Sequence, residues 1–238
     1  MKTQDLEYRD EAGGRYVGYL ASPEHPTGPA ILIGHGAPGI DAHERDVAQR
    51  LAELGYVALA ADYLGAENTV SQEAKGARLQ ALFADSTGLR APMQTALAAL
   101  KAIAGVAADR VAVIGYCFGG TAALELGCTG ADFKALIGLH CALPLSHPAD
   151  YRNIKCPVLL LQGARDPIVP PEMRTAFAAQ MNETEVDWRE VLYGQALHGF
   201  TMRNAEKFGR PDVVYHQRTD ERSWRAMLDL FAETIGAP

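Results

Sequence analysis

Short, continuous apolar runs recur along the chain, and they constrain its fold more than any other feature. Most of them lack the alternation of apolar and polar residues that marks a strand with one exposed face, so they predict strands covered on both faces. Segments with helical periodicity separate several of the runs. Such alternation predicts an α/β fold, a mostly parallel twisted sheet with helices on both faces. The runs are residues 30–33, 56–61, 110–115, 135–139, 157–162 and 186–192.

Helices are expected where apolar residues recur every three or four positions. One such helix begins after Asp41, its N-cap, and ends before Gly55, with Val47, Leu51 and Leu54 on one face. Further helices are predicted over residues 94–103, 121–126, 171–181 and 219–235.

The start of the chain differs from the rest, because residues 15–20 predict an antiparallel strand before a turn rich in proline and glycine. No internal repeat and no linker divides the remainder of the chain. We therefore expect residues 1–238 to form a single domain.

Composition excludes several classes of protein. Hydrophobic residues make up 48% of the chain and charged residues 21%, as in globular and not disordered proteins. The net charge of −7 argues against nucleic-acid binding. Neither a membrane-spanning apolar run of about 18 residues nor a signal peptide is visible. The four cysteines have no CxxC spacing, which favours free thiols and a cytoplasmic location.

A nucleophile motif follows the apolar run at 110–115. Residues 115–120, Gly-Tyr-Cys-Phe-Gly-Gly, join that strand to the helix at 121–126, which is the strand–turn–helix context of a nucleophile elbow. The glycines allow a strained turn in which strand and helix approach closely. A helix N-terminus also favours the thiolate form of a cysteine. We predict that Cys117 is the nucleophile and not a buried structural thiol. The cysteines without such a context are Cys128, Cys141 and Cys156.

A thiol nucleophile needs a base, and the base needs an acid that orients it. Asp166 follows the run at 157–162, and His198 follows the run at 186–192. Because parallel strands end at one edge of a sheet, both side chains can converge on Cys117, in the order nucleophile, acid, histidine. Taken singly, Asp166 could instead begin a turn, and His198 could be a solvated loop residue.

Backbone N–H groups must stabilise the oxyanion that forms on the substrate. One is expected from Phe118, directly after the nucleophile, and the other from Ala37, since the neighbouring Pro38 has no N–H. His35 and His43 could be taken for a metal pair, but no third ligand accompanies them, so we expect no metal.

These motifs resemble the dienelactone hydrolase family of α/β-hydrolases over almost the whole chain. The resemblance implies an α/β-hydrolase fold, a triad of Cys117, His198 and Asp166, and hydrolysis of ester bonds in unsaturated lactones without a cofactor. The expected partner is a small ester or lactone, and either a monomer or a dimer is compatible with the sequence. The matching segments are residues 54–58, 61–63, 115–120, 163–166 and 198–200.

The chain departs from the family pattern at two positions, one beside the thiol and one expected to bind the substrate. Family members commonly carry a glutamate near the thiol, where this chain has Gly36, so only the helix terminus and His198, with His35 as an alternative helper, are expected to control ionisation of Cys117. A family arginine four residues after the histidine is replaced by Met202. Candidate substrate contacts are His35, Gly36, Tyr116, Arg78 and Arg203.

The sequence therefore predicts a cofactor-independent hydrolase of carboxylic esters or lactones that works through a thioester on Cys117. Two alternatives stay open. One is a non-hydrolytic binding protein of the same fold with a redox-sensitive thiol, and the other is an acyl transferase or thioesterase that uses the same triad.

Overall fold

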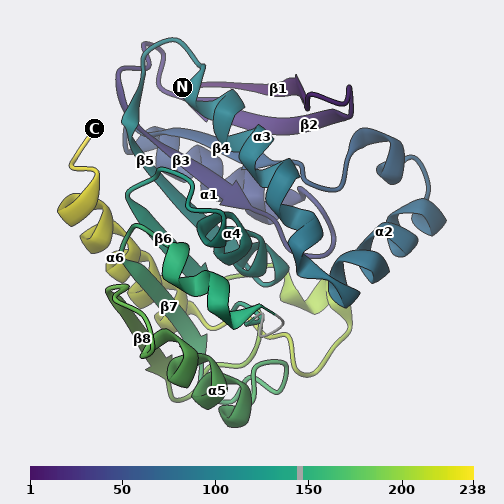
Figure 1. Ribbon diagram of the computed structural model, residues 1–238, viewed down its shortest axis with the longest axis vertical. Helices are drawn as coiled ribbons and strands as arrows, with labels where there is room; N and C mark the ends of the chain where they lie inside the picture. Colours follow the sequence, from purple (N-terminus) through teal and green to yellow (C-terminus); the bar gives the residue numbers. More distant parts are fainter. Residues whose placement is uncertain (144–146) are drawn as a thin grey trace.

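The computed structural model describes residues 1–143 and 147–238, and these form a mostly parallel sheet flanked by helices (Figure 1). Strands β3 to β8 run parallel, whereas β1 and β2 are antiparallel to their neighbours. The strand order is β1-β2-β4-β3-β5-β6-β7-β8. The strands are β1 (Lys2–Arg9), β2 (Arg15–Ser22), β3 (Gly28–Gly34), β4 (Val57–Ala61), β5 (Val106–Tyr116), β6 (Ala135–Leu139), β7 (Val158–Gly163) and β8 (Trp188–Tyr193).

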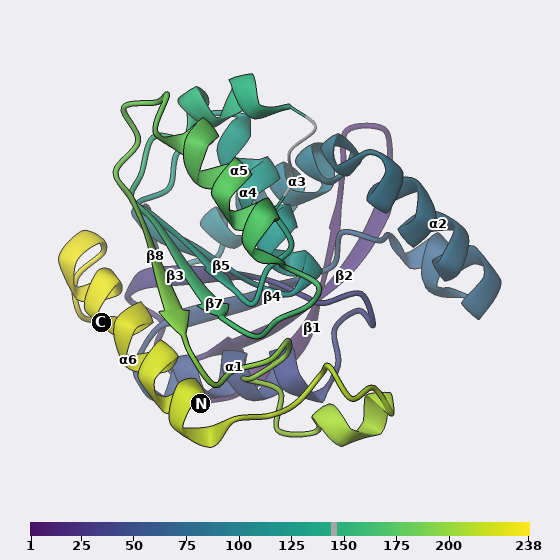
Figure 2. The ribbon, with the colours of Figure 1, turned by 90° about the horizontal axis from the view of Figure 1, so that it is seen from below.

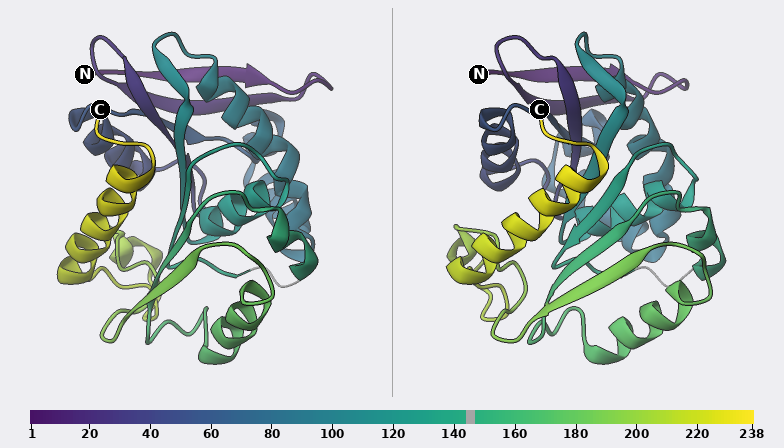
Figure 3. Two further views of the ribbon diagram at one scale, coloured as in Figure 1. Left: turned by 60° about the vertical axis from the view of Figure 1, so that its left-hand side comes forward. Right: turned by 90° about the vertical axis from the view of Figure 1, so that its left-hand side faces the viewer.

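Helices cover both faces of the sheet, as Figure 2 shows: α1 and α6 lie on one face and α3, α4 and α5 on the other. Helix α2 lies at the periphery of the molecule. The sheet is strongly twisted, so β1 and β2 cross the direction of β8 at a steep angle (Figure 3). The helices are α1 (Ala42–Glu53), α2 (Gln72–Ala84), α3 (Arg90–Lys101), α4 (Phe118–Cys128), α5 (Pro171–Met181) and α6 (Gln217–Thr234).

The central strands are buried on both faces, which accounts for the continuous apolar runs. Leu32 and Val113 are paired in register and pack into the core beneath α3 and α4. The next pair, Ile33 and Ile114, packs into the second core, beneath α1 and α6. All four side chains are inaccessible to solvent. The predicted α/β fold, with a mostly parallel sheet and helices on both faces, is confirmed.

Local signals set the ends of α1 as predicted. Asp41 is the N-cap and forms a capping box with Glu44, and Gly55 has a φ of 102°, which favours glycine and ends the helix. Val47 and Leu51 are buried on the face that packs on the sheet, whereas Leu54 caps the helix and is 47% exposed.

Two elements were not predicted, because their sequences carry little apolar periodicity. Strand β1 is a mostly exposed edge strand, and it is held by pairing along its whole length with β2. Helix α2 buries only Leu82 among its residues. No helix in either described segment has the length and apolar character needed to cross a membrane.

Candidate active site

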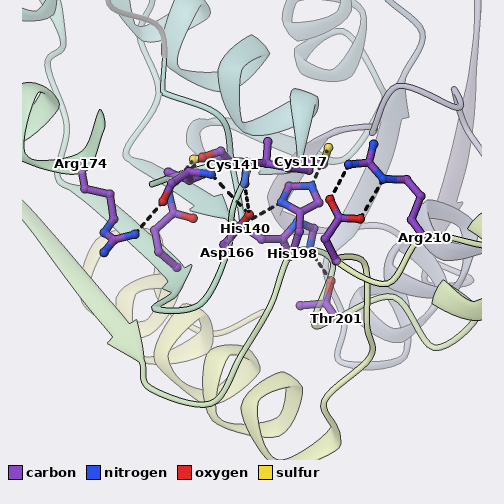
Figure 4. A network of polar contacts seen from close by, with 12 residues as sticks. Cys117, His140, Cys141, Asp166, Arg174, His198, Thr201 and Arg210 are labelled. Atoms are coloured by element: carbon purple, nitrogen blue, oxygen red, sulfur yellow. Dashed lines mark hydrogen bonds and ion pairs between the residues drawn. The ribbon is translucent and has the colours of Figure 1, made fainter. Parts of the chain in front are cut away.

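Three side chains meet at the carboxyl ends of β5, β7 and β8 (Figure 4). The ring Nε2 of His198 lies 3.1 Å from Sγ of Cys117, and its Nδ1 lies 2.7 Å from Oδ2 of Asp166. His198 and Asp166 are buried, while Cys117 is partly accessible. The structure thus brings together the three residues that the sequence singled out, with the imidazole between thiol and carboxylate.

Cys117 occupies a strained turn at the N-terminus of α4. Its φ of 54° lies in the left-handed region that non-glycine residues rarely adopt. A Cβ atom on Gly115 would come within 2.0 Å of the carbonyl oxygen of Gly119, and one on Gly119 within 2.1 Å of that of Gly34. Only glycine fits at these two positions, which lets strand and helix converge and directs the thiol out of the turn.

The two carboxylate oxygens of Asp166 have different partners, one in its own turn and one on His198. Its Oδ1 accepts the backbone N–H of Ile168 at 2.8 Å and that of Val169 at 3.3 Å. Its Oδ2 faces His198. The turn interpretation of Asp166 and its role as partner of the histidine are therefore compatible, since each uses a different oxygen.

The surroundings of His198 favour the protonated imidazole. Burial acts to lower its pKa, but the hydrogen bonds to Asp166 and Cys117, together with their charges, outweigh burial and raise it to about 10. At neutral pH an imidazolium then faces the sulfur of Cys117.

The two backbone N–H groups expected to bind the oxyanion make no hydrogen bond within the described residues. In the described part of the chain, neither the backbone N–H of Phe118 nor that of Ala37 has an acceptor. Phe118 opens α4, and Ala37 lies in the loop after β3, on the wall of the same cavity as Cys117. Both groups are available to a ligand oxygen near the thiol.

A cavity of about 200 Å³ opens above Cys117 and His198. Its walls are largely apolar, so it suits an uncharged organic group more than a strongly hydrated one. It is lined by Gly36, Ala37, Pro38, Glu44, Tyr116, Cys117, Ile168, His198, Met202, Phe208, Arg210 and Val213.

Two ionisable residues that line this cavity were not among the residues singled out from the sequence. Glu44 is 2% exposed and accepts the N–H of Gly36, so a carboxyl group lies in the cavity wall although position 36 itself carries none. Arg210 also lines the cavity, and its Nε donates to Asp212 at 3.0 Å. The capping-box spacing could have pointed to Glu44 as an ordered residue. No local pattern marks Arg210.

The two predicted arginine contacts are not brought to the cavity. Arg78 lies on α2, where its guanidinium donates to the carbonyl of Gly88 at 3.4 Å. Arg203 lies 3.9 Å from Asp46. Met202 lines the cavity, whereas the side chain of Arg203 is directed to α1. The position next to Met202 in sequence therefore does not place Arg203 at the cavity.

Of the remaining predicted contacts, Gly36 and Tyr116 line the cavity and His35 does not. His35 is buried beneath the loop, stacked on Tyr63 with ring centroids 3.9 Å apart, and burial lowers its pKa. It is therefore placed as a neutral packing residue. Within residues 1–143 and 147–238, no group of three His, Cys, Asp or Glu side chains is arranged to hold a metal ion.

Gly36 offers a direct test of charge beside the thiol. A Cβ atom there would lie 3.8 Å from Cβ of Cys117, so the Glu side chain of Gly36→Glu begins beside the Cys117 side chain. Because like charges repel, we expect this variant to slow alkylation of Cys117 by iodoacetamide at neutral pH, and also inactivation by peroxide, by roughly tenfold. Gly36→Gln is the uncharged control. Faster alkylation in the Glu variant alone would contradict this prediction.

Known proteins resemble this chain both in sequence and in structure. The sequence model of the dienelactone hydrolase family matches residues 17–235. A carboxymethylenebutenolidase of Pseudomonas sp. strain P51 is 28% identical over 185 residues, which cover 73% of this chain and 75% of that protein.

Two solved structures superpose over nearly the whole chain. One, named m3DLH, has a TM-score of 0.91 and 38% identity, and covers 98% of both chains. The other is a dienelactone hydrolase-like promiscuous phosphotriesterase from metagenomic libraries, with a TM-score of 0.90, 33% identity and coverage of 99% of both chains.

Proposed function

Because the chain belongs to the dienelactone hydrolase family and is a hydrolase of ester or lactone bonds, we propose that it cleaves them by covalent catalysis on Cys117. His198 is then the acid and base, and Asp166 orients it. The observation that carries this proposal is the continuous contact from Asp166 through His198 to Cys117, with a strained turn presenting the thiol.

Acylation begins with the thiolate of Cys117 attacking the carbonyl carbon of the substrate. The carbonyl oxygen becomes an oxyanion, which the N–H groups of Phe118 and Ala37 stabilise. The intermediate then collapses, the carbon–oxygen bond of the leaving group breaks, and the imidazolium of His198 protonates the departing alkoxide or enolate. The product of this step is a thioester on Cys117.

Deacylation uses the same groups in the reverse roles. His198, now neutral, removes a proton from a water molecule that attacks the thioester carbonyl. The second oxyanion collapses, the carboxylic acid leaves, and the thiolate is regenerated beside the imidazolium. Asp166 keeps the Nε2 side of the ring directed at Cys117 throughout both steps.

The nucleophile restricts the substrate class. A thiolate leaves more readily than an alkoxide, so the first intermediate returns to substrate unless the ester has a good leaving group. Enol lactones and aryl esters meet this condition, and alkyl esters and amides do not. The apolar cavity walls favour the uncharged body of such substrates.

We therefore expect enol and aryl esters to be hydrolysed at least about 100-fold faster, by kcat/KM, than alkyl esters with the same acyl group, because the leaving group limits acylation. The measurement is initial rates over a matched ester series, with an aryl phosphotriester added to test the activity named for one structural relative. Equal or faster turnover of the alkyl esters would contradict the proposed order of steps.

Mass spectrometry of the quenched reaction tests the intermediate itself. A slow aryl ester is expected to add one acyl group to the peptide that contains Cys117. A binding protein with a redox-sensitive thiol would neither acylate nor release product. An acyl transferase would pass the acyl group to added alcohol in preference to water, so the products distinguish these alternatives.

A further inference from the structure

We propose that Glu44 is a positioning residue of the hydrolase: its carboxyl group joins the two ends of the loop at residues 36–41 and so holds the Ala37 N–H toward Cys117. This inference rests on the proposed function. It concerns a buried group that the steps above do not use.

The carboxyl group of Glu44 bridges backbone groups that are five residues apart. Its Oε1 accepts the N–H of Gly36 and its Oε2 accepts the N–H of Asp41, each at 3.1 Å. Glu44 lies in the first turn of α1, and this helix is anchored in the core by Val47 and Leu51. The bridge therefore ties the loop to a rigid element.

Few other contacts determine the course of the loop. A turn hydrogen bond joins the N–H of Gly39 to the carbonyl of Gly36 at 3.1 Å, and the ammonium of Lys75 contacts the carbonyl of Pro38. The first bond is internal to the loop, and the second is solvent-exposed and comes from a side chain on α2. The ring Nδ1 of His35 also contacts the carbonyl of Gly36 at 2.6 Å, but among the described residues only the buried Glu44 connects the loop to α1 on both sides of Ala37.

The carboxyl group of Glu44 holds its proton more strongly than an ordinary glutamate, which matters because an oxyanion forms in the same cavity during the proposed reaction. Burial, followed by the charge of Asp41, raises its pKa to about 8. At neutral pH the group is mostly uncharged, so it shapes the loop without opposing an oxyanion in the same cavity. Its two oxygens still accept the two N–H groups.

The capping box provides a matched control. Asp41 forms the reciprocal half of the box, since its side chain accepts the N–H of His43 at 2.6 Å. Asp41→Ala removes this bond and weakens the same helix end, but it leaves both hydrogen bonds from Glu44 to the loop intact. If Glu44 acted only by stabilising the end of the helix, Asp41→Ala and the Glu44 variants would lower kcat equally.

The decisive variant is Glu44→Gln, which keeps the size of the side chain. An amide oxygen can accept only one of the two N–H groups, and the NH₂ group cannot accept the other. We expect kcat/KM for an aryl ester to fall about 10- to 100-fold, mainly in kcat, because the oxyanion donor is displaced. Alkylation of Cys117 by iodoacetamide forms no oxyanion, and its rate should stay within about twofold of wild type. Because Asp41→Ala removes a charge that helps to raise the pKa of Glu44, a loss of kcat smaller than that of Glu44→Gln is expected, not a fully unchanged rate.

The outcomes separate this inference from the function it rests on. Wild-type kcat in Glu44→Gln, or an equal loss in Asp41→Ala, overturns the positioning role. A parallel loss of alkylation overturns it too, because Glu44 would then act on the thiol. If the wild-type protein is not acylated by any ester, the proposed function fails and the inference with it. Glu44→Ala, which removes both bonds, is expected to lose at least as much activity as Glu44→Gln.

Discussion

Cys117→Ala is expected to abolish ester hydrolysis, with kcat reduced by roughly four orders of magnitude or more, since no other group can form the thioester. The variant should fold like the wild type. Alanine is smaller than cysteine, and it meets the same backbone strain at a φ of 54°. The measurement combines initial rates on an aryl ester with thermal unfolding.

The control is a cysteine outside the proposed site. Cys156 is buried in the same core as Leu32 and Val113, and Cys156→Ala should lower stability without changing the reaction. A folded Cys117→Ala protein with wild-type turnover would remove the nucleophile assignment and the thioester with it.

Replacing His198 should cost at least as much as replacing Asp166. His198→Ala loses the group that moves the protons. Asp166→Asn keeps that group and loses only the carboxylate charge and the orientation that Asp166 gives to the imidazole. We expect losses in kcat of about 10⁴-fold or more for the first and about 10²- to 10⁴-fold for the second. The amide of Asp166→Asn can still accept the N–H groups of Ile168 and Val169, so the turn should persist.

The pH profile of Asp166→Asn adds an independent readout. The hydrogen bond to Asp166 and its charge help to raise the pKa of His198 to about 10. Their removal lowers that pKa, so the imidazolium that protonates the leaving group is lost at lower pH than in the wild type. The alkaline limb of kcat/KM should shift toward neutral pH. An unmoved limb, or a larger loss in Asp166→Asn than in His198→Ala, would mean that the acid and the base are misassigned.

Much of the fold could be predicted because its signals are local. Double burial of β3 and β5 requires continuous apolar runs, and a turn with Cys117 in the left-handed region requires glycine at 115 and 119. The same reasoning failed for β1 and α2. These peripheral elements bury little surface of their own, so they depend on neighbours and leave no periodic pattern.

The sequence alone determined the order of Cys117, Asp166 and His198 and the strand ends that carry them, because parallel strands finish at one edge of a sheet. The walls of the cavity were decided by tertiary structure. The bond of Glu44 to Asp41 is local, but its bond to Gly36 depends on how α1 packs beside β2 and β4, and Arg210 joins a cavity wall that residues 36–38 and Glu44 also form. The positions of the strands along the chain follow from the apolar runs, but the direction of a side chain depends on how its helix or loop packs, which local sequence does not encode.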